Sequence, residues 1–229
     1  MPSFSRRSRD LELIDYPQPP EEWEEALRYI KVVNRWLGGT RAVLWHFRRW
    51  SRRWKPGERI VVLDAGAGAA DIPLALARWG RAAGFDLQVV ALDLTRECLD
   101  RARRDTGREL SLVRGDALRL PLRQVDYVMS SMFFHHMTDD DCVRLLRSYA
   151  AVARRGILVN DLLRRRRAWA WAIVTSGFYG RLARNDAPLS VLRAFTKKEA
   201  RDLAAQAGVP WLRVNEFFGH RFTLAGERP

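Results

Sequence analysis

One segment near residue 60 constrains the fold of this chain more than any other. The apolar run 60–63 leads into Asp64, and a turn of small residues with Gly66 and Gly68 follows at once. An apolar pattern with helical spacing begins directly behind the turn, at Ile72. A strand, a glycine loop and a helix in this order let the backbone approach a nucleotide-like ligand closely. Because several nucleotide-binding classes share such a loop, the segment predicts the kind of site but not its ligand.

Strands and helices alternate beyond this unit. The sequence predicts strands at 60–64, 87–93, 110–113, 125–130 and 156–160, and helices at 72–83, 96–105, 139–153 and 196–207. Continuous apolar strands separated by helices indicate a parallel sheet that is covered on both faces. Two further strands, at 211–214 and 221–224, are expected to form a terminal antiparallel hairpin. We therefore expect an α/β fold with a doubly wound, seven-stranded, mostly parallel sheet.

Residues 1–55 are expected to form an N-terminal arm and a helical lid ahead of a domain at 56–229. Prolines keep residues 1–20 extended, a helix follows to residue 37, and Thr40 is predicted to cap a second helix. Within the domain, a lid insert is expected at about 164–195, helical in its first half and an ordered loop from Asn185 onward. The loop should enter a helix that Thr196 and Glu199 cap together.

Composition narrows the class of protein. The formal net charge is +13, but the arginines responsible are spread along the whole chain, so nucleic-acid binding is not expected. Cys98 and Cys142 lie far apart without a CxxC pair, so we expect reduced cysteines and no metal centre. There is no apolar run of the ~20 residues that a membrane span needs, and the first ten residues lack a signal core. A cytoplasmic location is expected.

Acidic residues follow the glycine loop at successive strand ends. Asp93 ends the second predicted strand, where a carboxylate can accept hydrogen bonds from a ribose diol. Asp116 follows the third strand, within reach of an exocyclic amine, and Asp64 at the mouth of the loop can fix the turn or receive a cationic group. A single Asp at a strand end is more often a cap or turn residue. Three at this spacing favour a ligand site.

With these residues the chain resembles the class I S-adenosylmethionine-dependent methyltransferases, in the small-molecule branch that includes enzymes of ubiquinone and menaquinone biosynthesis. The resemblance covers about residues 55–225. Segment 62–68 matches the family's first motif, Asp93 the ribose-binding acid and the pair 116–117 the adenine-side position. Asp71 matches an acid behind the glycines, which would repel a pyrophosphate but suits a sulfonium. Ala70 replaces a frequent third glycine, and its methyl group is tolerable at negative φ.

The resemblance implies S-adenosylmethionine as the cofactor. The residues expected to hold it are Asp64, Gly66, Gly68, Asp71, Asp93, Leu94, Asp116, Ala117 and Ser130.

Two histidines are the candidates for catalysis. His135 and His136 follow the fourth predicted strand, at the sheet edge where ligands of such folds bind. Either could act as a general base near neutral pH. Alternatively, one packs against the sheet and the other makes a local hydrogen bond. The residues expected to shape a substrate pocket are Trp36, Phe133, Phe134, Asp186 and Arg193. For the last two, bracing a loop is an equally good interpretation.

The predicted function is methyl transfer to a small, largely apolar acceptor, as in secondary metabolism. O-methylation of an aromatic or enolic hydroxyl, in a quinol or polyketide-like molecule, is favoured. The basic, Trp-bearing segment 164–179 could close over the substrate or contact an anionic membrane surface. Two alternatives stay open: an RNA or protein methyltransferase, motivated by the charge, and a non-catalytic cofactor-binding protein, motivated by Ala70.

Overall fold

The computed structural model describes residues 2–121 and 124–229. Its strands form one sheet in the order β3-β2-β1-β4-β5-β7-β6. The strands are β1 (Arg59–Ala65), β2 (Asp86–Asp93), β3 (Ser111–Arg114), β4 (Val125–Ser131), β5 (Ala153–Leu162), β6 (Arg213–Phe217) and β7 (Arg221–Glu227). The first five strands of this order pair in parallel, while β7 runs antiparallel to both β5 and β6. The predicted fold class and the terminal hairpin are confirmed.

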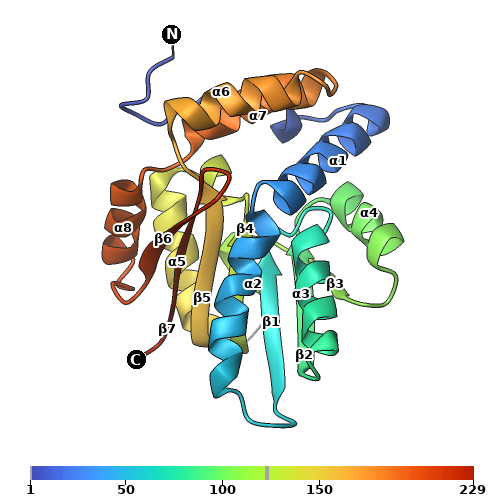
Figure 1. Cartoon of the computed structure of the whole chain (residues 1–229), viewed down its shortest axis with the longest axis vertical. Coiled ribbons are helices and arrows are strands. Elements are labelled where there is room, and N and C mark those ends of the chain that lie inside the picture. Colours follow the sequence, from blue (N-terminus) through green and yellow to red (C-terminus); the bar gives the residue numbers. More distant parts are fainter. Residues whose placement is uncertain (1, 122–123) are drawn as a thin grey trace.

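Helices cover both faces of the sheet (Figure 1). They are α1 (Pro20–Trp36), α2 (Gly39–Trp50), α3 (Asp71–Ala82), α4 (Arg96–Thr106), α5 (Asp139–Val152), α6 (Arg166–Ser176), α7 (Arg181–Arg193) and α8 (Lys197–Gln206). Side chains alternate along each strand, so Ile60 and Val62 of β1 join the apolar cluster under α2 and α3. Leu63 and Ala65 join the opposite cluster, under α5 and α8. The core is therefore two-sided, as in a doubly wound fold.

The strand order reverses between β1 and β4, which are neighbours in the sheet although two strands lie between them in the sequence. The loops that leave the carboxyl ends of β1 and β4 consequently diverge to opposite sides. Such a reversal point opens a crevice at the carboxyl edge, where ligands of open α/β sheets bind. The fold therefore places the glycine loop after β1 and the histidine segment after β4 at one crevice.

Helices α1, α6 and α7 lie across the carboxyl end of the sheet, with the N-terminal arm beside them (Figure 1). Polar contacts hold them together: the backbone N–H of Gly180 donates to Glu25 Oε1 at 2.8 Å, and Arg181 pairs with Glu22 at 2.9 Å. The arm is fixed by Arg7, whose guanidinium donates to the carbonyl of Met137 at 2.9 Å. These segments roof the crevice.

Two local predictions are wrong. Helix α2 starts at Gly39 with Gly38 as its N-cap, so Thr40 lies inside the helix. Gly38 takes this role because its φ is +84° and a Cβ there would lie 2.5 Å from the carbonyl oxygen of Phe218. The expected loop from Asn185 is helical, as part of α7, even though Pro188 lies within it. The cap of α8 by Thr196 and Glu199 is confirmed, with both reciprocal hydrogen bonds present.

Candidate active site

The glycine loop borders a cavity of about 930 Å³ at the carboxyl ends of β1, β2 and β3, called here the donor cavity. Gly66 has φ +75°, and a Cβ on it would lie 2.5 Å from the ring of Phe133. Gly68 has φ +54° with open space around its missing side chain, and its N–H donates to Asp93 Oδ2 at 2.8 Å. Gly66 thus makes room for the ring of Phe133, and Gly68 leaves open backbone beside the cavity.

Ala70 departs from expectation. Its φ is +57°, so it occupies the left-handed region and not the negative φ under which its methyl group was expected to be tolerated. A non-glycine residue in that region costs roughly 1–2 kcal/mol. The residue is fully buried in the core beneath α3 and does not line the donor cavity. Its methyl group therefore leaves the cavity open.

Carboxylates make the donor cavity strongly acidic. Asp64 is buried, and its Oδ1 has no hydrogen-bond partner among the described residues. Burial, together with the neighbouring charges of Asp71 and Asp93, raises the pKa of Asp64 well above its ordinary value. Burial also raises the pKa of Asp71, which accepts hydrogen bonds from the amide of Asn34. Because an unpaired buried carboxylate is costly, this cavity suits a ligand that brings positive charge.

The other residues predicted for cofactor binding lie around the same cavity, with one exception. Asp93 and Asp116 line it, Leu94 is exposed at its rim, and Ala117 is buried in its wall. Ser130 does not line it, which corrects the prediction. Successive side chains of a strand point to opposite faces, so Ser131 reaches the cavity while Ser130 is buried.

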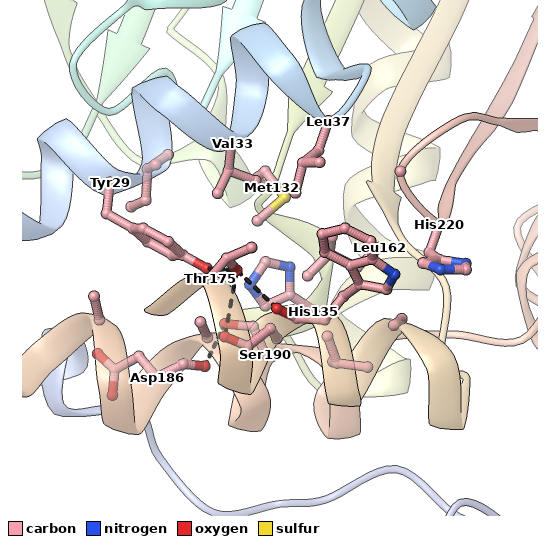
Figure 2. Close-up of a pocket in the computed structure, with 18 of the residues that line it drawn as sticks. Tyr29, Val33, Leu37, Met132, His135, Leu162, Thr175, Asp186, Ser190 and His220 are labelled. Carbon is pink, nitrogen blue, oxygen red and sulfur yellow. Dashed lines mark hydrogen bonds between the residues drawn. The ribbon is translucent and has the colours of Figure 1, made fainter. Parts of the chain in front are cut away.

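A second cavity, of about 490 Å³, lies under the roof and is called here the acceptor cavity. Figure 2 shows Tyr29, Val33 and Leu37 of the α1 segment pointing into it from one side, with Thr175 and Ser190 of α6 and α7 on the other. The Tyr29 and Thr175 hydroxyls are 3.1 Å apart, which joins α1 to α6 across the cavity. The wall is mainly aliphatic and aromatic, and charged side chains also line it: Glu12, Arg165, Arg167, Asp186 and Glu216.

The two cavities meet at the loop after β4. Ile14, Ile30, Met132 and His136 line both of them. Met132 has φ +54°, a strained conformation that a hydrogen bond from its N–H to the carbonyl of Asn160 (2.9 Å) helps to hold. A ligand in one cavity can therefore contact a ligand in the other at this junction.

His135, His136 and Glu12 form a cluster at the junction. His135 is buried, and its Nδ1 lies 2.7 Å from Asp161 Oδ1. We assign the proton to this nitrogen, because the carboxylate needs a donor, which leaves the Nε2 lone pair facing Glu12. His136 Nδ1 lies 3.1 Å from Asp15 Oδ1 in the same manner. The structure thus brings the two predicted histidines together with three carboxylates.

Glu12 is the residue of this cluster that sequence reasoning missed. It is 2% exposed although it belongs to the N-terminal arm, and its Oε1 has no hydrogen-bond partner among the described residues. Burial raises the pKa of Glu12 to about 7, although the charges of His136 and Arg193 act against this shift. The sequence offers only a weak indication that Glu12 is buried. It is an acidic residue between the apolar Leu11 and the apolar pair 13–14, in a segment expected to be extended.

Of the five residues predicted to shape the substrate pocket, only Asp186 lines the acceptor cavity. Trp36 is 68% exposed and lines a separate surface cavity. The stripe of α1 that faces the acceptor cavity continues from Val33 to Leu37, so Trp36 falls beside it. Phe134 is buried in the core, where its ring centroid lies 6.1 Å from that of Tyr149. Phe133 lines the donor cavity and not the acceptor cavity, which corrects its assignment to the substrate pocket.

Asp186 and Arg193 hold the roof in place. Asp186 lines the acceptor cavity and accepts hydrogen bonds from the backbone N–H groups of Leu13 (2.8 Å) and Ile14 (3.0 Å). Arg193 does not line the acceptor cavity, which corrects its assignment to the pocket; it is buried and donates to the carbonyls of His135 (3.1 Å) and His136 (2.8 Å). Asp186 therefore fixes the arm that carries Glu12, and Arg193 fixes the turn that carries the histidines.

The chain is similar to known methyltransferases. Residues 62–156 match the family described as "Methyltransferase domain". An uncharacterised methyltransferase of Geobacillus sp. (strain WCH70) is 26% identical over 118 residues, which are 49% of this chain and 53% of the relative. The chain thus spans about half the length of that curated relative.

Solved structures of methyltransferases share the fold. A SAM-dependent methyltransferase from Aquifex aeolicus superposes with a TM-score of 0.61 at 18% identity, covering 92% of this chain and 99% of the other. The magnesium protoporphyrin IX methyltransferase of Synechocystis PCC 6803, with bound SAH, gives 0.59 at 13% identity, covering 97% and 90%. An O-methyltransferase family 2 protein of Planctomyces limnophilus, in complex with apigenin, gives 0.58 at 17% identity, covering 90% and 62%. These structures share the fold, and the SAH bound to the Synechocystis enzyme accords with the predicted cofactor, S-adenosylmethionine.

Proposed function

Since the chain carries a methyltransferase domain in an S-adenosylmethionine-dependent methyltransferase fold, we propose that it methylates a small, largely apolar acceptor. The reaction is O-methylation of an aromatic or enolic hydroxyl, in a quinol or polyketide-like molecule. The observation that carries this proposal is the apolar acceptor cavity, which opens onto the donor cavity at Met132 and His136. We also place the chain in the small-molecule branch that its motifs resemble.

The donor cavity fits the charge of S-adenosylmethionine. The carboxylate oxygen of Asp64 that has no hydrogen-bond partner among the described residues would, together with Asp71, face the ammonium and sulfonium of this cofactor. Gly66 and Gly68 leave room for close approach, and Asp93 and Asp116 are the acids for the ribose and the adenine amine. Leu94 and Ala117 complete the adenine side. When bound, the cofactor supplies an electrophilic methyl group, so that an oxygen–methyl bond can form as the methyl–sulfur bond breaks and leaves its electron pair on sulfur.

The acceptor side of the junction assists loss of the hydroxyl proton. Glu12, His135 and His136 line the acceptor cavity where it meets the donor cavity, so an acceptor hydroxyl placed there faces both the cluster and the methyl donor. General-base assistance contributes typically 10²–10⁴-fold, and positioning supplies the rest. The apigenin bound to the Planctomyces limnophilus protein and the porphyrin named for the Synechocystis enzyme are aromatic molecules, which supports an aromatic acceptor here.

An acceptor panel tests this function. The full chain is incubated with methyl-labelled S-adenosylmethionine and with phenols, quinols, total RNA or a protein lysate. We expect labelled phenol or quinol ethers, and we expect His136→Asn to lower kcat by about 100-fold. Asp86→Asn, an exposed residue at the far end of β2, serves as the matched control. Label in RNA or protein alone, or in no acceptor despite cofactor binding, contradicts the proposal in favour of the two alternatives left open by the sequence.

A further inference from the structure

We propose that Glu12, His135 and His136 form a binding site for one divalent transition-metal ion at the junction of the two cavities. The site deepens the proposed function, because a cation at this point would hold and acidify the acceptor hydroxyl. The sequence predicts no metal centre because its two cysteines lie far apart without a CxxC pair, and Glu12 is distant in the chain from the pair at 135–136. The fold brings the three together.

The geometry of the three side chains suits one ion. Glu12 Oε1 lies 3.8 Å from His135 Nε2, and Glu12 Oε2 lies 3.9 Å from His136 Nε2. One ligand atom from each of the three residues lies within 4.8 Å of the other two. Ligands about 2.1 Å from a tetrahedral ion are ~3.4 Å apart. The two Glu12–histidine separations are too long for hydrogen bonds and would shorten by about half an ångström around an ion, while a separation at the 4.8 Å bound would shorten by ~1.4 Å.

Each histidine is oriented as a metal-bound histidine is. The Nδ1 of His135 is 2.7 Å from the buried carboxylate of Asp161, and the Nδ1 of His136 is 3.1 Å from Asp15. A carboxylate on the far nitrogen fixes the tautomer with its Nε2 lone pair free, and makes that nitrogen a better ligand. Both Nε2 atoms then face Glu12. Both carboxylate–histidine pairs thus direct a free nitrogen toward the Glu12 carboxylate. Local hydrogen bonds alone do not explain this arrangement.

Glu12 points independently to a ligand. Its side chain is 3% exposed, yet Oε1 has no hydrogen-bond partner among the described residues. The nearest cationic side chain, Arg193, has its Nε 3.7 Å from Oε1, and that guanidinium already donates to the carbonyls of Asp10, His135 and His136. A buried carboxylate oxygen that accepts no hydrogen bond is costly. A cation between Glu12 and the imidazoles would satisfy it.

The three ligands indicate which metal ion would bind, and their position at the acceptor cavity indicates what the ion would do. Two imidazoles and one carboxylate favour Zn²⁺, Fe²⁺ or Mn²⁺ over Mg²⁺ or Ca²⁺, which prefer oxygen ligands alone. Three protein ligands leave a position open, as in catalytic sites. The acceptor cavity is lined by all three ligands, so an acceptor hydroxyl can take that position. Coordination would lower the pKa of the hydroxyl, so the ion would take the place of the general-base assistance described above and the proton would pass to water.

Direct metal binding tests the site. The chelator-treated full chain is titrated with Zn²⁺ by calorimetry and with Co²⁺ by visible absorption, which reports four- or five-coordinate cobalt. We expect one equivalent to bind, and we expect Glu12→Gln to weaken binding by at least ~100-fold, since loss of an outer carboxylate alone costs 10–100-fold. Asp161→Asn should fall within that smaller range. His220→Asn, a histidine of the same cavity outside the cluster, is the matched control and should bind as the unaltered chain does.

The outcomes separate this site from the proposed function. Every variant is first shown to bind S-adenosylhomocysteine, whose cavity Glu12 does not line, so a misfolded variant is recognised. No metal binding by the unaltered chain, or equal binding by Glu12→Gln, overturns the metal site. Full methylation activity in the chelated protein would likewise overturn it while leaving the methyl transfer intact. Loss of S-adenosylhomocysteine binding in the unaltered chain would instead contradict the proposed function.

Discussion

At the scale of single residues, Asp93 is where loop geometry and ligand binding meet. Its two carboxylate oxygens accept the backbone N–H groups of Gly68 (2.8 Å) and Thr95 (2.9 Å), yet the side chain still borders the donor cavity. Each oxygen keeps a free lone pair for a ribose hydroxyl. We predict that Asp93→Ala weakens S-adenosylhomocysteine binding about 10–100-fold, because hydrogen bonds to a charged group are worth about 1.5–3 kcal/mol each.

Calorimetric titration measures this effect, with Asp86→Asn at the other end of β2 as the control. Unchanged affinity in a folded Asp93→Ala protein would refute the ribose assignment.

His46 predicts an acid-sensitive stability at the same scale. It is buried on α2, with Nε2 2.8 Å from Thr223 Oγ1 of β7. Burial, reinforced by the charge of Arg49, lowers the pKa of His46 to about 4. In this pH range His46 is therefore protonated in the unfolded chain but not in the folded chain. The free energy of unfolding falls as the pH drops from about 6.5 to about 4.

Between about pH 7 and pH 5 this single group should remove ~2 kcal/mol of unfolding free energy. His46→Gln can keep the hydrogen bond to Thr223 but does not titrate. Urea unfolding at both pH values should show the variant gaining that amount relative to the unaltered chain. A stability difference that does not change with pH would contradict this account of His46.

At the scale of elements, α6 forms one wall of the acceptor cavity with a stripe at helical spacing, Ala168, Trp171, Ala172 and Thr175. We predict that Trp171→Ala raises KM for an apolar acceptor about tenfold, since burying a large apolar side chain against a ligand is worth about 1.5–3 kcal/mol. Binding of S-adenosylhomocysteine should not change, because Trp171 lies outside the donor cavity.

Val174→Ala is the matched control for α6. Val174 is as exposed as Trp171 on the same helix, but it does not line the acceptor cavity. Steady-state kinetics should therefore separate the two variants. Equal KM values for them would mean that α6 does not contact the acceptor.

The elements also show what the sequence could predict and why. Strands and helices between residues 59 and 162 fall within a few residues of expectation, because apolar runs and glycine turns there are local signals. Helix α7 was missed because Asn185, Asp186 and Pro188 are typical of a loop. In the fold Asp186 instead accepts backbone N–H groups of the arm, a tertiary contact that local patterns do not encode.

The candidate site follows the same division. The donor cavity is built from the continuous segment β1, glycine loop and α3, together with the ends of β2 and β3. The spacing of acidic residues in the sequence is therefore enough to locate Asp64, Asp93 and Asp116. The acceptor half of the site depends on long-range packing: Glu12 reaches His135 only because the arm crosses the sheet edge. The exposure of Trp36 could not be predicted from the sequence either, because it depends on the direction in which α1 lies over the sheet.

At the scale of the whole molecule, we predict that the net charge of +13 does not make a specific RNA-binding surface. Arginines such as Arg78, Arg155 and Arg181 pair with carboxylates, which leaves them less available to phosphates. Each helix of the described ranges is too short or too polar to span a bilayer. We predict only non-specific RNA binding, with Kd of about 10⁻⁴–10⁻⁶ M near physiological salt. Fluorescence anisotropy with a labelled RNA checks this, and submicromolar affinity would contradict it.

The central claim is that the acidic cavity beside the glycine loop binds S-adenosylmethionine. The most direct test is calorimetric titration of the full chain with S-adenosylhomocysteine, with NAD as the control ligand. We predict one equivalent bound with micromolar affinity and no detectable heat with NAD, because Asp64 and Asp71 repel a pyrophosphate. NAD binding, or no S-adenosylhomocysteine binding by the folded protein, would contradict the claim.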